Sequence, residues 1–297
     1  MVDFDIFAPD KILINEPLKN HTTFKIGGAC DIIFLPSDVL DIKACINICK
    51  RNSIRFFIMG NGSNLLVRDE GYRGVIIKLG KNISSIYQRE DGLDYAQAGA
   101  SLKSLSKYFI EKSLSGFEFA DGIPGTVGGG VIMNAGAYYG EMAMVVHQVD
   151  ILDKNTGDIR TLNNDDMQFG YRYSRIKTSG DIVLGASFKL KKTLDKNTIV
   201  QKITELNNMR KDKQPLNMPS AGSTFKRPIG LYAGKLISDA GLKGYRIGDA
   251  CVSDKHAGFV VNMGNATAAE VILLIEHIKT TVKQKYDVLL EEEVVII

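Results

Sequence analysis

Two glycine-containing segments of this chain have the composition of loops that hold an anionic ligand. Residues 122–140 read GIPGTVGGGVIMNAGAYYG, with seven glycines among nineteen residues and no charged side chain. Because glycine loses more conformational entropy on folding than any other residue, such a run is destabilising unless something must approach the backbone closely. Main-chain N–H groups that wrap an anionic cofactor would explain the run. A tight crossover between packed elements would explain it equally well.

The second segment, GNGSNLLV (Gly60–Val67), directly follows a predicted strand, which is the usual setting for phosphate contact. It is neither a Rossmann fingerprint, because Leu65 occupies the third glycine position, nor a Walker loop, because no Lys-Ser/Thr pair follows. Alone, the segment is explained as well by a plain turn. Together, the two glycine segments predict one long ligand with a diphosphate, held from two lobes.

Three polar positions could act on a substrate. Arg172 lies between two tyrosines in FGYRYSRIK, Ser223 lies in a glycine-containing turn in PSAGSTFKRP, and three glutamates interrupt the β-forming terminus VLLEEEVVII. Arginine either forks onto a carboxylate or stacks on aromatic rings, and a turn serine commonly bonds its own backbone. Charges on an edge strand also prevent aggregation. Strand alternation would place Glu291 and Glu293 on one face and Glu292 on the other.

The hydrophobic pattern predicts the elements that position these residues. Strands are predicted at 31–35, 55–59, 75–79, 95–99, 181–190, 258–263 and 288–297, with a hairpin formed by 145–153 and 159–162. Helices are predicted after the caps Ser37 and Ser101, over 196–211 and 232–240, and from Thr267, which forms a capping-box pair with Glu270.

At 297 residues the chain is longer than one hydrophobic core usually supports. We expect a first lobe over 1–80, a second over 81–195, a third domain over 196–286 and a terminal strand over 287–297.

Composition narrows the functional class. Apolar residues make up 44% and charged residues 24%, as in ordinary globular proteins, and the net charge of +3 is too small to indicate nucleic-acid binding. Even the most basic stretch, 189–213, with eight Lys or Arg against three acids, is more typical of a solvated helix face. No apolar run has membrane-spanning length, and the start lacks a signal-peptide pattern, so we expect a cytoplasmic protein.

The four cysteines are sparse, and the spacing of Cys45 and Cys49 indicates buried thiols on one helix face. No histidine joins them at ligand spacing, and we expect no metal.

Taken in order, the motifs of this chain resemble those of the UDP-N-acetylenolpyruvoylglucosamine reductase family over nearly its whole length. They are NHTTFKIGG, GNGSNLLV, GIPGTVGG with MNAGAY, FGYRYS, SAGSTFK, AGLKGYRIGDACVSDKHAGFVVN and LEEEV. The short interval between the Arg172 and Ser223 motifs resembles the compact form of the family, which lacks an additional substrate-covering loop. The resemblance implies an α+β fold, with a two-lobed FAD-binding domain of the vanillyl-alcohol-oxidase/PCMH type and a C-terminal α+β substrate-binding domain.

The resemblance also implies a flavoenzyme that reduces UDP-N-acetylglucosamine enolpyruvate to UDP-N-acetylmuramate for peptidoglycan synthesis. FAD is the implied cofactor and NADPH the electron donor, with both substrates using one site in turn. We expect a monomer. The implied FAD-contacting residues are Gly60, Asn61, Gly62, Ser63, Asn64, Leu65, Gly122, Ile123, Gly125, Thr126, Gly128, Gly129, Ala135 and Gly136. The implied catalytic residues are Arg172, Ser223 and Glu293, and the implied substrate contacts are Tyr171, Lys226, Arg227 and Lys243.

Three positions depart from the family pattern. Tyr139 and Arg227 stand where the family commonly has Gly and Asn, and Glu292 stands where Pro usually precedes the catalytic Glu. None of these changes removes a catalytic residue.

Two other functions fit parts of the pattern. An oxidase of small alcohols on the same FAD scaffold is not excluded by the fold alone, although the Arg–Ser–Glu set suits a substrate with a carboxylate. A non-catalytic nucleotide-sugar or RNA-binding protein could use the glycine loops and the basic stretch, but it would not carry FAD.

Overall fold

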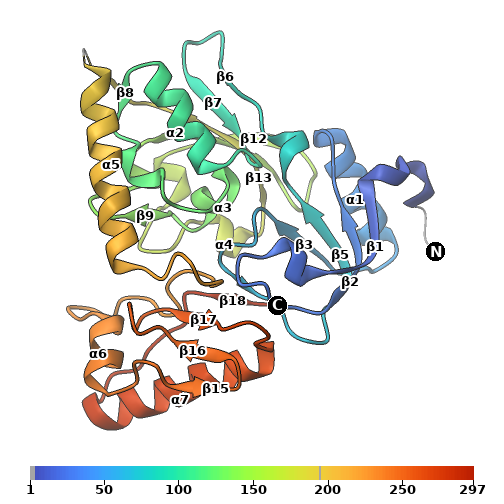
Figure 1. Ribbon diagram of the computed structural model, residues 1–297. Coiled ribbons are helices and arrows are strands. Elements are labelled where there is room, and N and C mark those ends of the chain that lie inside the picture. Colours follow the sequence, from blue (N-terminus) through green and yellow to red (C-terminus); the bar gives the residue numbers. More distant parts are fainter. Residues whose placement is uncertain (1–3, 194) are drawn as a thin grey trace. The chain divides into compact units, whose positions relative to one another are not determined.

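The computed structural model describes residues 4–193 and 195–297, which divide into two compact units (Figure 1). Unit 1 consists of the described residues up to Leu13, Ile33–Gly60 and Val75–Arg210. Unit 2 consists of Ile14–Ile32, Asn61–Gly74 and Lys211–Ile297. Each unit is therefore assembled from segments that are far apart in the sequence. The predicted lobe boundaries stay a prediction.

Helices and strands alternate irregularly along the chain. The α-helices are α1 Val39–Arg51, α2 Leu102–Glu111, α3 Val127–Ile132, α4 Ile176–Ser179, α5 Lys196–Lys213, α6 Ala233–Asp239 and α7 Ala268–Tyr286. The strands are β1 Ile12–Pro17, β2 Ala29–Phe34, β3 Phe56–Met59, β4 Leu65–Leu66, β5 Tyr72–Lys78, β6 Ile86–Gln88, β7 Asp94–Gln97, β8 Leu114–Ser115, β9 Gly136–Ala137, β10 Gly140–Glu141, β11 Val146–Leu152, β12 Ile159–Asn163, β13 Ile182–Phe188, β14 Lys191–Lys192, β15 Arg246–Ile247, β16 Ala250–Val252, β17 Val260–Asn262 and β18 Val295–Ile296.

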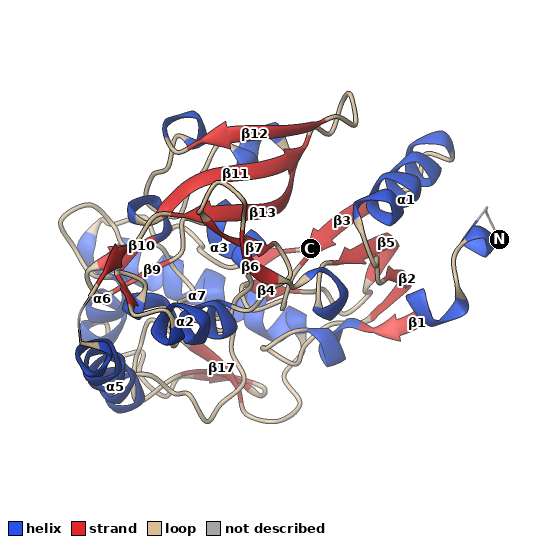
Figure 2. Cartoon of the chain, turned by 90° about the horizontal axis from the view of Figure 1, so that it is seen from above, coloured by secondary structure: helices blue, strands red, loops and turns tan. Residues whose placement is uncertain are grey.

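The largest sheet lies in unit 1 and has the strand order β12-β11-β13-β7-β6. All its pairings are antiparallel, and Figure 2 shows β12, β11 and β13 side by side. Every residue of β13 is buried, so this central strand is covered on both faces. The predicted hairpin is confirmed as β11 and β12.

Phenylalanines form the core of unit 1 next to this sheet. The rings of Phe109 on α2, Phe117 and Phe188 on β13 pack edge to face, with centroids 5.2–5.7 Å apart. The α2 helix begins where predicted, because the Ser101 side chain accepts a hydrogen bond from the Ser104 amide. Phe109 and Phe117 lie before the glycine-rich run in the sequence, and Phe188 lies after it.

A second sheet has the order β1-β2-β5-β3, and β3 pairs in parallel with β5. The α1 helix leads into β3 and lies beside it in both ribbon views (Figures 1 and 2). The predicted cap of α1 is wrong by one residue. Asp38, rather than Ser37, accepts the Asp41 amide, because a carboxylate satisfies this end of a helix at least as well as a hydroxyl.

Unit 2 is built around α7. Its N-terminus has the predicted capping box between Thr267 and Glu270. Residues of α7 such as Val271, Leu274 and Ile278 share one buried cluster with Phe225 and with Val294 near the end of the chain. The three-stranded sheet β15-β16-β17 belongs to the same unit. The segments that carry Ser223 and Glu293 are therefore anchored in one hydrophobic core.

The predicted terminal strand over 288–297 is wrong in extent. Only Val295 and Ile296 form a strand, β18, which pairs in parallel with β4. Upstream, Glu292 forms an isolated bridge with Phe225. The terminal segment changes its hydrogen-bond partner along its length, so no single neighbouring strand runs beside all of it.

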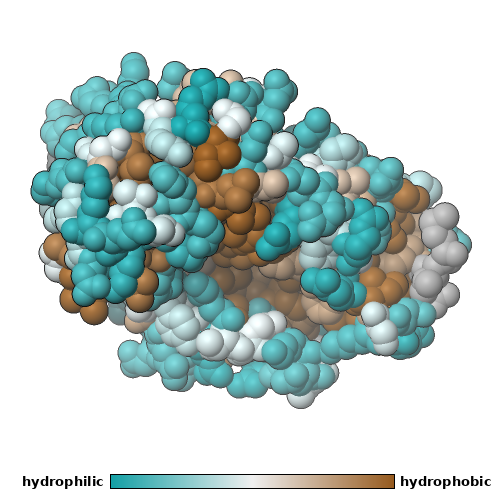
Figure 3. Space-filling view, turned by 90° about the horizontal axis from the view of Figure 1, so that it is seen from below, coloured by the Kyte–Doolittle hydropathy of each residue, from teal (hydrophilic) through white to brown (hydrophobic). Residues whose placement is uncertain are grey.

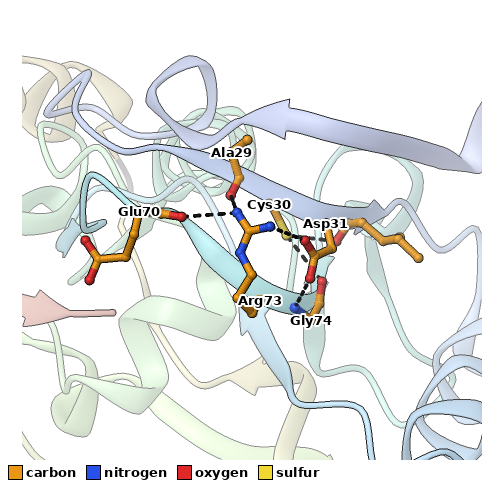
Figure 4. A network of polar contacts seen from close by, with 7 residues as sticks. Ala29, Cys30, Asp31, Glu70, Arg73 and Gly74 are labelled. Carbon is orange, nitrogen blue, oxygen red and sulfur yellow. Dashed lines mark hydrogen bonds and ion pairs between the residues drawn. The ribbon is translucent and has the colours of Figure 1, made fainter.

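A polar network in unit 2 ties the start of β5 to β2 (Figure 4). The Arg73 guanidinium contacts Asp31 at 2.6 Å and donates to the carbonyls of Ala29 and Glu70. Asp31 also accepts the Gly74 amide at 2.8 Å. Because the Arg73 side chain is 65% exposed, this network serves local alignment more than stability.

Polar residues cover most of the face in Figure 3. Among the described residues, no helix is long and apolar enough to cross a membrane. All four cysteines are buried and free, including Cys45 and Cys49, whose spacing predicted buried thiols. Within the described part of the chain, no group of His, Cys, Asp or Glu has the arrangement of a metal site.

Candidate active site

Several glycines of the 122–140 run are explained by neighbouring protein atoms. A Cβ added at Gly128 would lie 3.0 Å from the Ala98 Cβ, and one at Gly136 would lie 2.8 Å from the Gly140 carbonyl oxygen. A Cβ at Gly140 would overlap the ring of Phe119. Close packing therefore accounts for much of this run, as the alternative interpretation of the sequence proposed.

Gly129 is different, because it is exposed in the first turn of α3. A Cβ there would meet only the Thr126 hydroxyl, at 3.6 Å. Thr126 caps this helix and is itself buried, with 2% of its surface exposed. The exposed side of this turn thus has room for a ligand to approach the backbone.

The two predicted ligand loops meet within unit 1. Gly60, at the end of β3, lies so close to Thr126 that an added Cβ would overlap the threonine hydroxyl and come within 3.1 Å of its methyl carbon. Glycine is thus required at position 60 by the second loop. The structure brings the first residue of the 60–65 loop to the cap of the glycine-rich helix, as one ligand spanning both loops requires.

A half-buried cation, Arg210, lies at the beginning of the glycine-rich run. The Arg210 side chain, near the C-terminus of α5, packs against Gly122, where an added Cβ would be 3.1 Å from both Cδ and Nη1. The Arg210 Nε is buried and has no hydrogen-bond partner among the described residues. Burial lowers the pKa of Arg210, against a small opposing effect of Tyr138. A guanidinium whose buried Nε donor is unused fits an anionic or carbonyl-rich cofactor.

Asn207, one helical turn before Arg210, fixes this part of α5. Its side-chain amide donates to the Asp121 carboxylate at 2.7 Å. Sequence reasoning missed Arg210, because in the sequence it is one more basic residue of the stretch 189–213.

In unit 2, the remainder of the first loop holds the terminal segment. Gly62 has a left-handed φ of 62° and packs against the backbone of His21 and Thr22, so no other residue fits there without strain. The Asn64 side-chain amide donates to the Glu293 carbonyl at 3.0 Å, and the Asn64 carbonyl accepts the Val295 amide at 2.9 Å. A predicted cofactor loop is therefore bonded directly to the segment that carries a predicted catalytic residue.

Ser223 and Glu293 are brought together by their backbones. The Glu293 amide donates to the carbonyl of Thr224, the residue next to Ser223, at 2.9 Å. Thr224 is held in turn, because its amide donates to the Gly258 carbonyl and its hydroxyl accepts the Val260 amide. Both Ser223 and Glu293 are half-buried. None of these hydrogen bonds uses the side chain of Ser223 or of Glu293.

The two glutamates before Glu293 are bound to lysines. Glu291 pairs with Lys226 at 2.9 Å and Glu292 pairs with Lys279 at 2.7 Å. Burial alone would raise the pKa of Glu292, but the hydrogen bond and charge of Lys279 outweigh it, so the pKa is lowered. Glu292, which replaces the usual proline, therefore has a structural partner in this chain.

Arg172 lies in unit 1 on a tight turn. Its φ of 54° is left-handed, which is uncommon for a residue other than glycine. The guanidinium lies over the Tyr171 ring at 5.1 Å and donates to the Gly136 carbonyl of the glycine-rich run at 3.3 Å. Aromatic stacking, the ordinary explanation of this arginine, thus occurs together with a contact to the predicted cofactor loop.

The remaining predicted residues are placed as follows. Asn61 is exposed, Ser63 is half-buried, Leu65 begins β4, the Ile123 amide donates to Ala120, the Gly125 carbonyl accepts the Leu102 amide, and the Ala135 amide donates to Gly130. Tyr171 and Lys243 are exposed, and Arg227 lies 4.7 Å above the Tyr232 ring. Tyr139 is 83% exposed at the tip of the β9–β10 hairpin, where no left-handed φ requires glycine.

Comparisons with known proteins show what this chain is similar to. Residues 30–163 match the model of an FAD binding domain, and residues 214–297 match the C-terminal domain of UDP-N-acetylenolpyruvoylglucosamine reductase. The reductase from Caldanaerobacter subterraneus subsp. tengcongensis is 48% identical over 99% of this chain and 96% of its own. One from Clostridium botulinum is 48% identical over 99% of this chain and 94% of its own.

Solved structures lead to the same result. The crystal structure of UDP-N-acetylenolpyruvylglucosamine reductase (MurB) from Thermus caldophilus matches with a TM-score of 0.82 and 33% identity, covering 96% of this chain and 97% of that one. A cholesterol oxidase mutant from Brevibacterium sterolicum matches with a TM-score of 0.50 and 11% identity, covering 65% of this chain and 40% of that one, which shows a shared fold only. The predicted fold class is confirmed. The chain is an FAD-dependent oxidoreductase, and it belongs to the UDP-N-acetylenolpyruvoylglucosamine reductase family.

Proposed function

We propose that this chain reduces the enolpyruvyl group of UDP-N-acetylglucosamine enolpyruvate to the lactyl ether of UDP-N-acetylmuramate, with NADPH as the electron donor. Membership of the reductase family supports the substrate and the place in peptidoglycan synthesis. The observation that carries the residue assignment is the backbone pairing of Glu293 with Thr224, beside Asn64 of the predicted cofactor loop. The proposed proton donor Ser223, the proposed carboxylate contact Glu293 and the proposed cofactor loop would thus share one framework in unit 2.

FAD would be held by the Gly60–Leu65 loop and by the residues of the 122–136 segment named above, with the Arg210 guanidinium as a further donor. When bound and reduced by NADPH, FAD supplies the hydride that adds to the terminal carbon of the enolpyruvyl group. The uncharged glycine loops provide backbone contacts, and charged residues of later segments act on the substrate.

Arg172 would bind the substrate carboxylate. Hydride addition to the terminal carbon moves negative charge toward the α-carbon and its carboxylate, and a guanidinium stabilises that charge through a bidentate, charge-assisted contact. Because the interaction strengthens as charge develops, it lowers the barrier more than it tightens substrate binding.

Glu293 would contact the same carboxylate. Two ionised carboxylates repel each other, so a hydrogen bond between them requires a shared or retained proton. Ser223 would deliver a proton to the α-carbon. An aliphatic hydroxyl is a weak acid and fills this role only where it is tightly positioned, which the bonds of the neighbouring Thr224 support.

The remaining assignments belong to the same proposal. Tyr171, Lys226, Arg227 and Lys243 would contact the substrate, and NADPH and the UDP-sugar would use one site in turn. We place the enzyme in the cytoplasm as a monomer that binds no nucleic acid.

The experiment that tests the function begins with the colour of the purified protein. A yellow protein that releases FAD on denaturation is expected, and NADPH should be consumed rapidly only when UDP-N-acetylglucosamine enolpyruvate is present. Rapid NADPH consumption that needs oxygen but not the sugar would indicate an oxidase. A colourless protein that cannot be reconstituted with FAD would contradict the proposal.

A further inference from the structure

We propose that Asn134 and Ser174 are positioning residues that hold the Arg172 turn in the orientation that the reaction needs. This inference rests on the role proposed for Arg172. Neither residue belongs to the predicted cofactor, substrate or catalytic set. Both are fully buried polar side chains of unit 1, with 0% of their surface exposed.

The turn that carries Arg172 is closed by two reciprocal hydrogen bonds. The Gly170 amide donates to the Tyr173 carbonyl at 3.0 Å, and the Tyr173 amide donates to the Gly170 carbonyl at 3.1 Å. Within this turn, Arg172 adopts its left-handed φ of 54°. Such a conformation persists in a residue with a side chain only when the surroundings hold it in place.

Asn134 and Ser174 bind both ends of this turn to one neighbouring segment. The Asn134 side-chain amide donates to the Gly170 carbonyl at 3.0 Å, at the beginning of the turn. The Ser174 hydroxyl donates to the Ile132 carbonyl at 2.8 Å, directly after the turn. The attachment therefore runs between residues 132–134 and residues 170–174, and it consists of two side-chain hydrogen bonds.

The same segment carries the acceptor of the Arg172 guanidinium. Gly136 lies two residues after Asn134, and its carbonyl accepts from Arg172 at 3.3 Å. The Asn134 carbonyl oxygen of the side chain also accepts the Ala143 amide at 2.9 Å, which fixes this segment to a third one. Turn, guanidinium and glycine-rich run are thus oriented together, with Asn134 at the centre.

A variant in which the Arg172 guanidinium is displaced should still fold and bind the cofactor. Its guanidinium would contact the substrate carboxylate poorly. A misplacement of about 1 Å in a reacting assembly can reduce the rate about 100-fold. The effect should fall on the half-reaction that involves the enolpyruvyl sugar. Reduction of the flavin by NADPH does not need a carboxylate contact of this kind.

The test measures both half-reactions by rapid mixing without oxygen in Asn134→Ala and in the milder Ser174→Ala. We expect reoxidation of the NADPH-reduced enzyme by UDP-N-acetylglucosamine enolpyruvate to slow by about 10- to 100-fold in Asn134→Ala and by about 3- to 10-fold in Ser174→Ala. Flavin reduction by NADPH should stay within about two-fold of the wild type.

Asn164→Ala is the matched control, because the Asn164 amide donates to the Ala143 and Val146 carbonyls but not to the Arg172 turn. It should lower the melting temperature and leave reoxidation unchanged. A double-mutant cycle with Arg172→Ala then separates positioning from general destabilisation. If Asn134 acts through Arg172, adding Asn134→Ala to Arg172→Ala slows reoxidation no further.

The outcomes distinguish this inference from the proposed function. If Arg172→Ala reoxidises like the wild type, the role proposed for Arg172 is wrong. If Arg172→Ala is slow while Ser174→Ala and a folded Asn134→Ala are both unaffected, the role of Arg172 stands and the positioning inference is overturned. Effects that multiply in the double variant would also overturn it, because they would show that Asn134 acts independently of Arg172.

Discussion

Two regions present the candidate catalytic residues, the Ser223 and Glu293 segments in unit 2 and the Arg172 turn in unit 1, and they are held in place by different means. In unit 2, the segments that carry Ser223 and Glu293 are joined by backbone hydrogen bonds, and their apolar neighbours Phe225 and Val294 lie in a shared core. In unit 1, the Arg172 turn has a strained backbone and is attached by two buried side chains. Backbone bonds are insensitive to most substitutions, whereas side-chain bonds are not. The Arg172 turn should therefore be the more easily disturbed.

The largest effect is expected for Ser223→Ala, which removes a reacting group without changing the backbone bonds around it. A general acid typically contributes about 100- to 10,000-fold in rate, so reoxidation by the enolpyruvyl sugar should slow by that order. Rapid mixing should show that NADPH still reduces the flavin at a nearly normal rate. Ser220→Ala, three residues earlier, is the control. The proposed role is wrong if flavin reduction is the step that fails.

The adjacent glutamates test whether the terminal segment is correctly assigned. Glu293→Gln should slow reoxidation by about 100-fold or more, as expected for loss of a group that shares a proton with the substrate. Glu291→Gln should change it by less than about two-fold, because the surface ion pair with Lys226 contributes little. Steady-state rates of the two variants show which glutamate the reaction needs. Equal effects would show that the catalytic glutamate has been misassigned.

A third substitution tests how well the Ser223 and Glu293 segments, called here the Ser223 arm, tolerate the loss of a side-chain hydrogen bond. Thr224→Ala leaves the buried Val260 amide without its acceptor, which should cost about 1–3 kcal/mol in the free energy of unfolding. The backbone bond from Glu293 remains, so reoxidation at a temperature well below melting should be nearly normal. Denaturant unfolding and rapid mixing on the same sample give both values. A large loss of rate would show that the Ser223 arm is as sensitive to side-chain substitution as the Arg172 turn.

The sequence predicted those features of the fold that depend on local residues. Ser101 and the Thr267–Glu270 pair start their helices as expected, and the β11–β12 hairpin forms where it was predicted. The terminal strand was overestimated, because β-forming residues around Glu291–Glu293 do not reveal that their partner changes along the segment. The β-propensity of residues indicates that a segment can be extended, but it does not indicate which segments will pair with it.

For the site, the motifs identified the candidate residues but not what holds or completes them. Asn134 and Ser174 act on residues 36 and 42 positions away, and no local pattern predicts such a pairing. A clue to Asn134 was present, since it is the one carboxamide in an uncharged glycine-rich run. Arg210 differs from the other basic residues near it only by its burial, which the sequence does not show.

The smallest expected effect concerns pH and the support of the Ser223 arm. His256 Nδ1 accepts the Gly258 amide at 3.1 Å, and the Gly258 carbonyl in turn accepts the Thr224 amide. Burial lowers the pKa of His256 below its ordinary value of 6.5, and the nearby charge of Lys243 lowers it further, although a backbone hydrogen bond opposes this. Between the pKa of His256 in the folded state and its ordinary pKa, the folded chain therefore binds fewer protons than the unfolded chain.

The contribution of His256 to the free energy of unfolding is therefore fully present above about pH 6.5. It is lost as the pH falls through the lower pKa that His256 has in the folded state. His256→Asn keeps an acceptor but cannot titrate, so its melting temperature should fall less than that of the wild type between pH 7.5 and pH 5. Parallel curves for the two proteins would show that His256 does not support this arm.

We propose that this chain passes electrons from its flavin to an enolpyruvyl sugar. A single turnover without oxygen, in which the NADPH-reduced enzyme is mixed with UDP-N-acetylglucosamine enolpyruvate, tests this transfer. We predict that the yellow absorbance of oxidised FAD returns, with about one UDP-N-acetylmuramate formed for each flavin. A flavin that stays reduced until air is admitted would show that this transfer does not occur.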